Sequence, residues 1–306
     1  MADGIHTREE LRRILRYRSR TFSGVHRRIA QFIQENYQQV IFMRAVEVAA
    51  KAGVSQASVT RFARLLGFQG YKAFVRRLQE LARIDLRAPE RMYYSLRHRD
   101  GHLQRIVTSE VENMQQVSAM VRQASFRRLV DAISSAPRVI LAGFRASRSL
   151  ADHFGYFLRY IHPNVEILTE GGSLIYDRLL SMDSRDALIV LLVFPRYPQE
   201  ALEFLRAVVL DGFRVACLTD SPSSPVCGET RNVVLAPISL AGLFDSYCAP
   251  MLMISLLLHE IGRSQSARTR AMLEAFERLV VRRKTFFSDA SSRPAHGRRR
   301  QDRRVR

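Results

Sequence analysis

The stretch KAGVSQASVTRFARLLGF, residues 51–68, places a glycine between two short helical patterns and gives the second pattern many polar side chains. Gly53 is suited to close the first helix in the left-handed conformation, and Ser55 can cap the second helix. The second helix has one apolar face, which consists of Val59, Phe62, Ala63 and Leu66. Its remaining side chains are mostly polar. The spacing predicts a helix, a tight turn and a capped helix.

The sequence on either side continues the helical pattern. Residues 22–42 repeat apolar side chains at helical spacing, with Ser23 as the N-cap, and residues 71–84 supply a further helix. Together these patterns predict an all-α N-terminal domain with a helix-turn-helix at its centre. In that geometry the second helix enters the major groove of DNA.

The polar face of this second helix carries the candidate DNA contacts. Gln56 and Arg61 can hydrogen-bond adenine and guanine, and the methyl group of Ala57 can touch thymine. The candidates for phosphate contacts, which fix the register without reading sequence, are Ser55, Ser58, Thr60 and Arg64. An ordinary solvated face of a helical bundle also carries arginines, so the spacing alone leaves both interpretations open.

Positive charge is concentrated at the two ends of the 306-residue chain, whose formal net charge is +19. Residues 1–86 hold 16 basic and 7 acidic side chains, and residues 282–306 hold 10 and 2. The intervening residues hold 22 and 20 and are nearly neutral. Both ends are therefore expected to attract a polyanion. Because residues 282–306 have almost no hydrophobic side chains after Phe287, they predict a disordered basic tail.

Strand patterns alternate with helical patterns in the second half of the chain. Residues 101–135 form one helical pattern that leads into this region, and residues 147–160 and 199–210 also read as helices. The strand patterns occupy residues 138–144, 165–169, 187–194, 213–220 and 232–237. Such alternation predicts an α/β domain with a parallel sheet flanked by helices on both faces.

Residues 239–262 are more apolar than a one-sided helix requires. They predict a long helix with one face against another subunit, so we expect a homodimer or homotetramer.

The longest apolar run, residues 251–259, is much shorter than the roughly 20 residues that cross a bilayer, which argues against a membrane partner. A charged N-terminal segment and three cysteines without metal-ligand spacing favour a cytoplasmic protein with reduced thiols and no metal or cofactor.

Residues 47–78, EVAAKAGVSQASVTRFARLLGFQGYKAFVRRL, closely resemble the N-terminal domain of the RpiR family of bacterial transcriptional regulators. Members of this family carry a C-terminal SIS domain, a parallel sheet of the sugar-isomerase type that usually binds phosphorylated sugars. Residues 139–154, 186–203 and 215–226 resemble two loop regions of that domain and a following strand. The resemblance implies two partners, a double-stranded DNA operator and a small anionic metabolite.

The two phosphate loops depart from the pattern of the family. The usual first loop is G-x-G-x-S, and here it runs from Gly143 to Ser147 with Arg145 in place of the second glycine. The usual second loop is S-x-S-G-x-T-x-E. When the chain is aligned on Glu200, its two serines, glycine and threonine are replaced by Val193, Pro195, Arg196 and Pro198. The hydroxyl groups that cradle a phosphate are therefore missing, and proline also lacks a backbone donor.

Two interpretations of this altered crevice remain open. In one, arginines replace the cradle and contact an anion directly, either a sugar phosphate or a related organic acid. The effector-binding candidates are then Arg145, Ser147, Arg148, Ser149 and Arg196. In the other, the crevice is vestigial and the sheet serves only for dimerisation. We favour the first, because arginines gather at the strand ends where open parallel sheets bind ligands.

SIS domains also occur in enzymes, so a sugar-phosphate isomerase with a basic appendage is the alternative function. Isomerisation needs a positioned acid and base. His153, His162 and His259 are scattered, so we interpret them as structural and predict a regulator without catalytic residues. The expected domains are an RpiR-type helix-turn-helix domain over 1–86, a helical connector over 87–136, an SIS-like effector-binding and dimerisation domain over 137–281, and the tail over 282–306.

Overall fold

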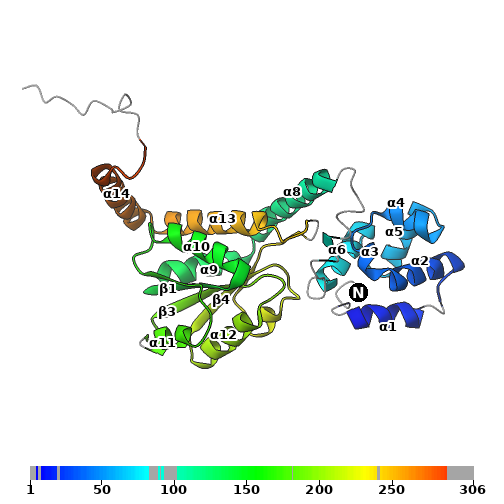
Figure 1. Cartoon of the computed structure of the whole chain (residues 1–306), viewed down its shortest axis with the longest axis horizontal. Coiled ribbons are helices and arrows are strands. Elements are labelled where there is room, and N and C mark those ends of the chain that lie inside the picture. The colour runs from blue at the N-terminus through cyan, green and yellow to red at the C-terminus, as the bar shows by residue number, and fades with distance from the viewer. Residues whose placement is uncertain are drawn as a thin grey trace, which may run out of the picture.

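The computed structural model of the chain describes residues 5, 8–18, 21–82, 89, 91–92, 102–180, 182–239 and 242–287. Figure 1 shows a group of N-terminal helices, coloured blue to cyan, and a second group in which helices cover a sheet. The predicted fold class, a helical N-terminal domain followed by a parallel sheet flanked by helices, is confirmed. Among the described residues, no helix is long and apolar enough to cross a membrane.

The N-terminal helices follow the predicted start and stop signals. Ser23 accepts a hydrogen bond from the backbone of the first turn of α2, Gly53 ends α4 at a φ of +63°, and Ser55 caps α5. Helix α1 is an addition to the predicted elements, and it buries Leu11 and Leu15. The helices are α1 (Arg8–Arg18), α2 (Gly24–Glu35), α3 (Tyr37–Val40), α4 (Ala45–Ala52), α5 (Gln56–Leu65) and α6 (Tyr71–Ala82).

Two buried tyrosines fix α6 against the preceding helices. The hydroxyl of Tyr71 donates to the carbonyl oxygen of Met43 at 3.0 Å, and the hydroxyl of Tyr37 donates to that of Leu78 at 3.0 Å. Burial raises the pKa of Tyr71 far above its ordinary value, so its phenol stays protonated and remains a donor. These bonds hold the scaffold that presents α5.

Residues 102–135 form two helices where the sequence predicted one continuous pattern over 101–135. Helix α8 (His102–Met120) ends, and α9 (Ala124–Ser135) begins after Gln123, whose backbone is extended at φ −73° and ψ 150°. The break lets α9 turn and pack one face on the sheet. That face consists of Phe126, Leu129, Val130 and Ile133.

The sheet has five parallel strands in the order β2-β1-β3-β4-β5. The strand order reverses between β1 and β3, because the chain moves outward to β2 and then returns to the other side of β1. The strands are β1 (Arg138–Gly143), β2 (Val165–Leu168), β3 (Ala187–Leu192), β4 (Arg214–Thr219) and β5 (Val233–Leu235).

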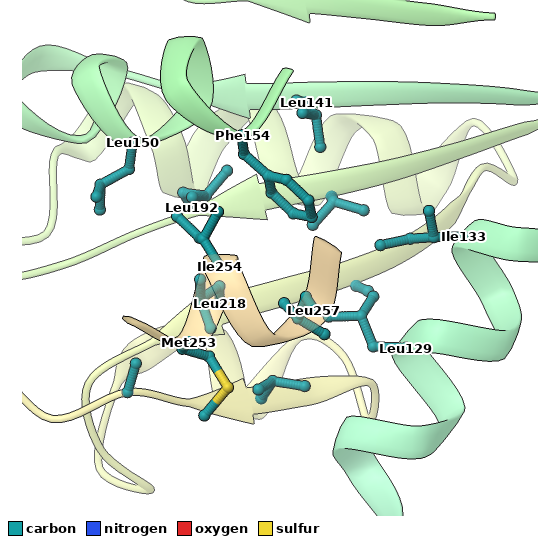
Figure 2. Close-up of a cluster of buried hydrophobic side chains, with 14 of the residues drawn as sticks. Leu129, Ile133, Leu141, Leu150, Phe154, Leu192, Leu218, Met253, Ile254 and Leu257 are labelled. Atoms are coloured by element: carbon teal, nitrogen blue, oxygen red, sulfur yellow. The ribbon is translucent and has the colours of Figure 1, made fainter. Parts of the chain in front are cut away.

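Side chains alternate along the central strands between two buried layers, as expected of strands buried on both faces. One face is covered by α9, α10 (Arg148–Leu158) and α13 (Cys248–Ser264), and Figure 2 shows Leu129, Phe154 and Ile254 from these helices meeting Leu141, Leu192 and Leu218 from the strands. The other face is covered by α11 (Leu174–Leu180) and α12 (Gln199–Leu210). The 3₁₀ helices η2 (Arg145–Ser147) and η3 (Pro225–Gly228) follow β1 and β4.

The prediction of one helix over 239–262 is wrong in its first third. Helix α13 begins only at Cys248, and the described residues before it, 239 and 242–247, form no helix but include an isolated antiparallel bridge between Ser239 and Ser246. Pro250 explains the boundary, because proline lacks a backbone donor and fits the first turn of a helix but not its interior. A further helix, α14 (Ser266–Arg283), follows α13 and extends away from the sheet in Figure 1.

Candidate functional site

One face of α5 is available to a partner. Helices α4 and α5 pack together and against α2, which buries the apolar side of α5. Gln56, Ala57 and Arg61 are exposed, and Thr60 is half-buried on the same side. Arg64 is exposed one turn further along, where its Nε donates to the carbonyl oxygen of Gln69 at 3.4 Å. The structure therefore brings these five predicted residues onto one side of the helix.

Ser58 supports this face from inside. Its side chain is buried, and its hydroxyl lies 2.9 Å from that of Ser55 and accepts a hydrogen bond from Nη2 of Arg61 at 3.1 Å. The hydroxyl of Ser55 also accepts from the backbone N–H of Ser58 at 3.2 Å. Because Ser58 is already engaged, it occupies a supporting position and not the exposed one expected of a phosphate contact. Its bond restricts the guanidinium of Arg61 before any partner binds.

A crevice of about 280 Å³ lies beyond the carboxyl ends of β1 and β3. This is the point where the strand order reverses, the usual ligand position in open parallel sheets. The loop after β1, the loop after β3 and the segment before α13 form its walls. Three predicted effector contacts line it together: Arg145, Ser147 and Arg196.

The loop after β1 has an unusual backbone at Arg145. This residue adopts a φ of +53°, in the left-handed region that side chains other than glycine rarely occupy. Gly143 precedes it at a close approach, where an added Cβ would lie 2.6 Å from the carbonyl oxygen of Ser147. A strained backbone persists only where the surrounding structure holds the residue in place. Such residues are found preferentially at ligand-binding and active sites.

Arg148 and Ser149 are not brought together with the other predicted effector contacts in the crevice lining. Both lie on the first turn of α10, where Arg148 pairs with Asp152 at 3.4 Å and the Ser149 hydroxyl donates to the carbonyl oxygen of Ala146. Neither is among the described residues that line the crevice. Both side chains are exposed and are held by these partners within or next to the helix.

Three polar residues of the crevice were not predicted. Arg91 and Asp245 form a largely buried ion pair, with 2.7 Å between Nη1 and Oδ1. Tyr247 lies in the same wall, and burial raises the pKa of its phenol although a hydrogen bond with Ser147 opposes the effect. Residues 239–247 were assigned to an apolar helix, so no local signal placed Asp245 or Tyr247 at the strand ends.

The three histidines considered as acid–base candidates are not among the described residues that line the crevice. His162 is buried with Nε2 3.0 Å from the carbonyl oxygen of Ala136, and burial lowers its pKa. His153 contacts the ring of Phe157 on α10. His259 lines a larger hollow of about 610 Å³ between α9 and α13. The smaller crevice is the candidate ligand site, because the larger hollow lies between two helices and away from the strand ends.

Two family models match the chain. The helix-turn-helix domain of the rpiR family matches residues 10–83, and the SIS domain matches residues 132–260. The chain carries an RpiR-family helix-turn-helix domain and a SIS domain. The match to the helix-turn-helix model includes α4 and α5, and the match to the SIS model includes the whole five-stranded sheet.

Two curated relatives are named as HTH-type transcriptional regulators. The uncharacterized HTH-type transcriptional regulator YfhH of Escherichia coli is 26% identical over 166 residues, which cover 53% of this chain and 58% of that protein. The alignments with curated relatives span less than two thirds of their lengths.

Two solved structures share the fold. The sugar isomerase domain of an RpiR transcription factor from Sphaerobacter thermophilus is 26% identical, has a TM-score of 0.55, and aligns over 58% of this chain and 99% of its own. The Vibrio vulnificus NanR protein, complexed with ManNAc-6P, is 18% identical with a TM-score of 0.52 over 89% of this chain and 98% of its own.

Proposed function

We propose that this RpiR-family protein is a transcriptional regulator that binds an operator through α5 and responds to a small anionic metabolite in the crevice of its SIS domain. The observation that carries the proposal is the capped, exposed face of α5 in a chain that also holds arginines at the strand ends of a SIS sheet. Both features serve the binding of anions, one a duplex and the other a metabolite.

The DNA contacts divide into two groups. Gln56, Ala57 and Arg61 lie on the first two turns of α5, the part of a recognition helix that reaches base edges in the major groove. Ser55, Thr60 and Arg64 are suited to phosphates, and the positive end of the helix dipole favours a phosphate near Ser55. The hydrogen bond from Arg61 to Ser58 supports the proposal that Arg61 contacts a base. The bond already restricts the Arg61 side chain, so less conformational entropy is lost when DNA binds.

The effector is an anion held by guanidinium groups. Arg145 and Arg196 line the crevice from two loops, and Ser147 lines it as well. The complex of V. vulnificus NanR with ManNAc-6P supports a sugar phosphate as the class of ligand. Because the usual hydroxyl cradle is replaced here, the grip on the anion differs from that of the family and also suits a carboxylate of an organic acid.

The alternative function, a sugar-phosphate isomerase, lacks support in the crevice. Isomerisation requires an acid and a base within reach of the substrate carbon atoms. The described carboxylate in the wall is that of Asp245, which is already paired with Arg91. The relatives described as transcriptional regulators favour the first function.

The same proposal extends to assembly and location. A regulator with one recognition helix per chain reads two half-sites as a dimer, and exposed apolar side chains on α10 and α14 offer a surface for a second copy. These side chains are Tyr156, Phe157, Leu273 and Leu279. We place the homodimer or homotetramer in the cytoplasm, where bacterial operators and metabolites meet.

Replacement of Arg196 tests the function most simply. Genomic footprinting first identifies the operator, and fluorescence anisotropy then measures operator affinity with and without sugar phosphates and organic acids. The Arg196→Gly variant should keep its operator affinity without ligand and lose the metabolite effect. Arg148→Gln is the matched control, because Arg148 lies nearby but pairs with Asp152, and it should respond as the wild type does. An unchanged metabolite response in Arg196→Gly would favour the vestigial crevice.

A further inference from the structure

Arg91 is buried although it belongs to the sequence between the two domains. Its side chain is 9% exposed, Nη1 contacts Oδ1 of Asp245 at 2.7 Å, and Nε donates to the carbonyl oxygen of Gly242 at 3.0 Å. The remaining nitrogen, Nη2, is buried and has no hydrogen-bond partner among the described residues. A guanidinium stays charged at all ordinary pH values, so an unpaired buried N–H group of this kind is costly.

The residue that carries this unpaired group belongs to the wall of the crevice. Arg91 lines the same hollow as Arg145, Ser147 and Arg196, and it comes from a different part of the chain than either strand-end loop. With Asp245 as the described carboxylate of the wall, the three arginines leave the crevice with an excess of positive charge. An anion in this space would meet guanidinium groups from three separate segments.

We propose that Arg91 is a ligand-binding residue, which donates Nη2 to the phosphate or carboxylate of the effector and thereby ties the connector to the occupied crevice. The inference rests on the proposed function of the crevice and adds a residue that no loop of the SIS pattern supplies. A planar guanidinium can serve two acceptors at once, so Asp245 keeps Nη1 while the anion takes Nη2. The carboxylate of Asp245 positions Arg91, and its negative charge repels the anion.

This arrangement gives the effector a route to the DNA-binding domain. A ligand changes a conformational equilibrium only if it binds one state better than another. Arg91 lies in the sequence between α6 and α8, and α8 contacts the N-terminal helices through Lys72 and Glu112, whose Nζ and Oε1 are 2.7 Å apart. The ligand therefore stabilises the state in which Arg91 contacts the anion. In that state the N-terminal part of the connector is held at the crevice.

Two substitutions with opposite expected signs test the proposal. Isothermal titration calorimetry of the full chain uses inorganic phosphate and ManNAc-6P as probes. Arg91→Gln should weaken binding about tenfold or more, the loss expected for one hydrogen bond to a charged group. Asp245→Asn keeps the shape of the side chain and removes a negative charge, so it should bind both probes more tightly.

Arg206→Gln is the matched control, because Arg206 also pairs with one carboxylate, that of Glu229 at 2.7 Å, away from the crevice. It should bind the probes as the wild type does. If Arg91 and Asp245 serve only to hold the fold, both variants should lose affinity and show lower urea midpoints, and that result would overturn the proposal. Should Arg91→Gln fail to fold, tighter binding by Asp245→Asn still supports the proposal and unchanged or weaker binding contradicts it.

The outcome also separates this inference from the proposed function. If Arg196→Gly abolishes probe binding while Arg91→Gln binds as the wild type does, the crevice is the effector site and the role of Arg91 is wrong. If the wild type binds neither probe, the effector site and the role of Arg91 are both overturned. If Arg91→Gln binds weakly and no longer shifts operator affinity at saturating probe, Arg91 carries the signal as well as the contact.

Discussion

Replacing Arg145 with glycine should make the SIS domain more stable and its ligand site weaker. The left-handed backbone of Arg145, at φ +53°, costs an L-residue about 1–2 kcal/mol, which glycine does not incur. Glycine also adds freedom to the unfolded chain, which costs about 0.5–1 kcal/mol. Because the Arg145 side chain is exposed, little packing is lost. The net expected gain is about 0.5–1 kcal/mol.

The same substitution removes a guanidinium from the crevice. One hydrogen bond to a charged group contributes about 1.5–3 kcal/mol, so the affinity for the anionic effector should fall at least about tenfold. Urea unfolding of the full chain, followed by circular dichroism, measures the first effect, and calorimetric titration with a sugar phosphate measures the second. The expected effects have opposite signs because the proposed function needs the strained Arg145 for binding.

Lys284→Gly provides the control. Lys284 has nearly the same backbone, at φ +52°, but caps α14 and lies outside the crevice. Its variant should bind the effector as the wild type does. A less stable Arg145→Gly protein, or one with undiminished affinity for the anion, would refute the link between strain and binding at this loop.

Three further outcomes are expected. Arg61→Ala should lose about 1–3 kcal/mol at the cognate operator and relax the preference at one base position, measured on a set of singly substituted duplexes; equal loss on every duplex would make Arg61 a phosphate contact. Truncation after Val281 removes ten basic residues and should flatten the dependence of log K on log salt without changing the preferred site, whereas an unchanged slope would exclude the tail from DNA. Burial lowers the pKa of His162, so on acidification the imidazole is protonated in the unfolded chain at a higher pH than in the folded one. The urea midpoint should therefore fall as the pH drops below about 6.5. A His162→Gln protein with the same pH dependence would contradict this assignment.

Local signals in the sequence were sufficient for the helix-turn-helix and for most of the sheet. Gly53 and Ser55 act over one or two residues, so their roles as stop and cap could be predicted. The run of Ala187–Leu192 is apolar throughout because both faces are covered, and this makes a buried parallel strand easy to recognise. Helix α12 has the predicted bounds for a similar reason, since its apolar spacing is regular.

The crevice could be predicted only in part. Arg145, Ser147 and Arg196 follow strands in sequence, so their meeting at one edge of the sheet could be expected. Arg91 and Asp245 are separated by 154 positions, and neither lies in a sequence pattern that predicts a long-range ion pair. The left-handed backbone at position 145 could not be predicted either, because arginine rarely adopts a positive φ.

Binding of the full chain to its own operator tests the central claim most directly. The measurement is the affinity for a footprinted genomic site and for a scrambled duplex of equal length, over a series of salt concentrations, with sugar phosphates assayed for turnover in parallel. We expect a preference of at least about 10³-fold for the operator, an affinity that falls with salt, and no conversion of the sugar phosphates. Equal affinity for both duplexes, or turnover of a sugar phosphate by the purified protein, would contradict the account.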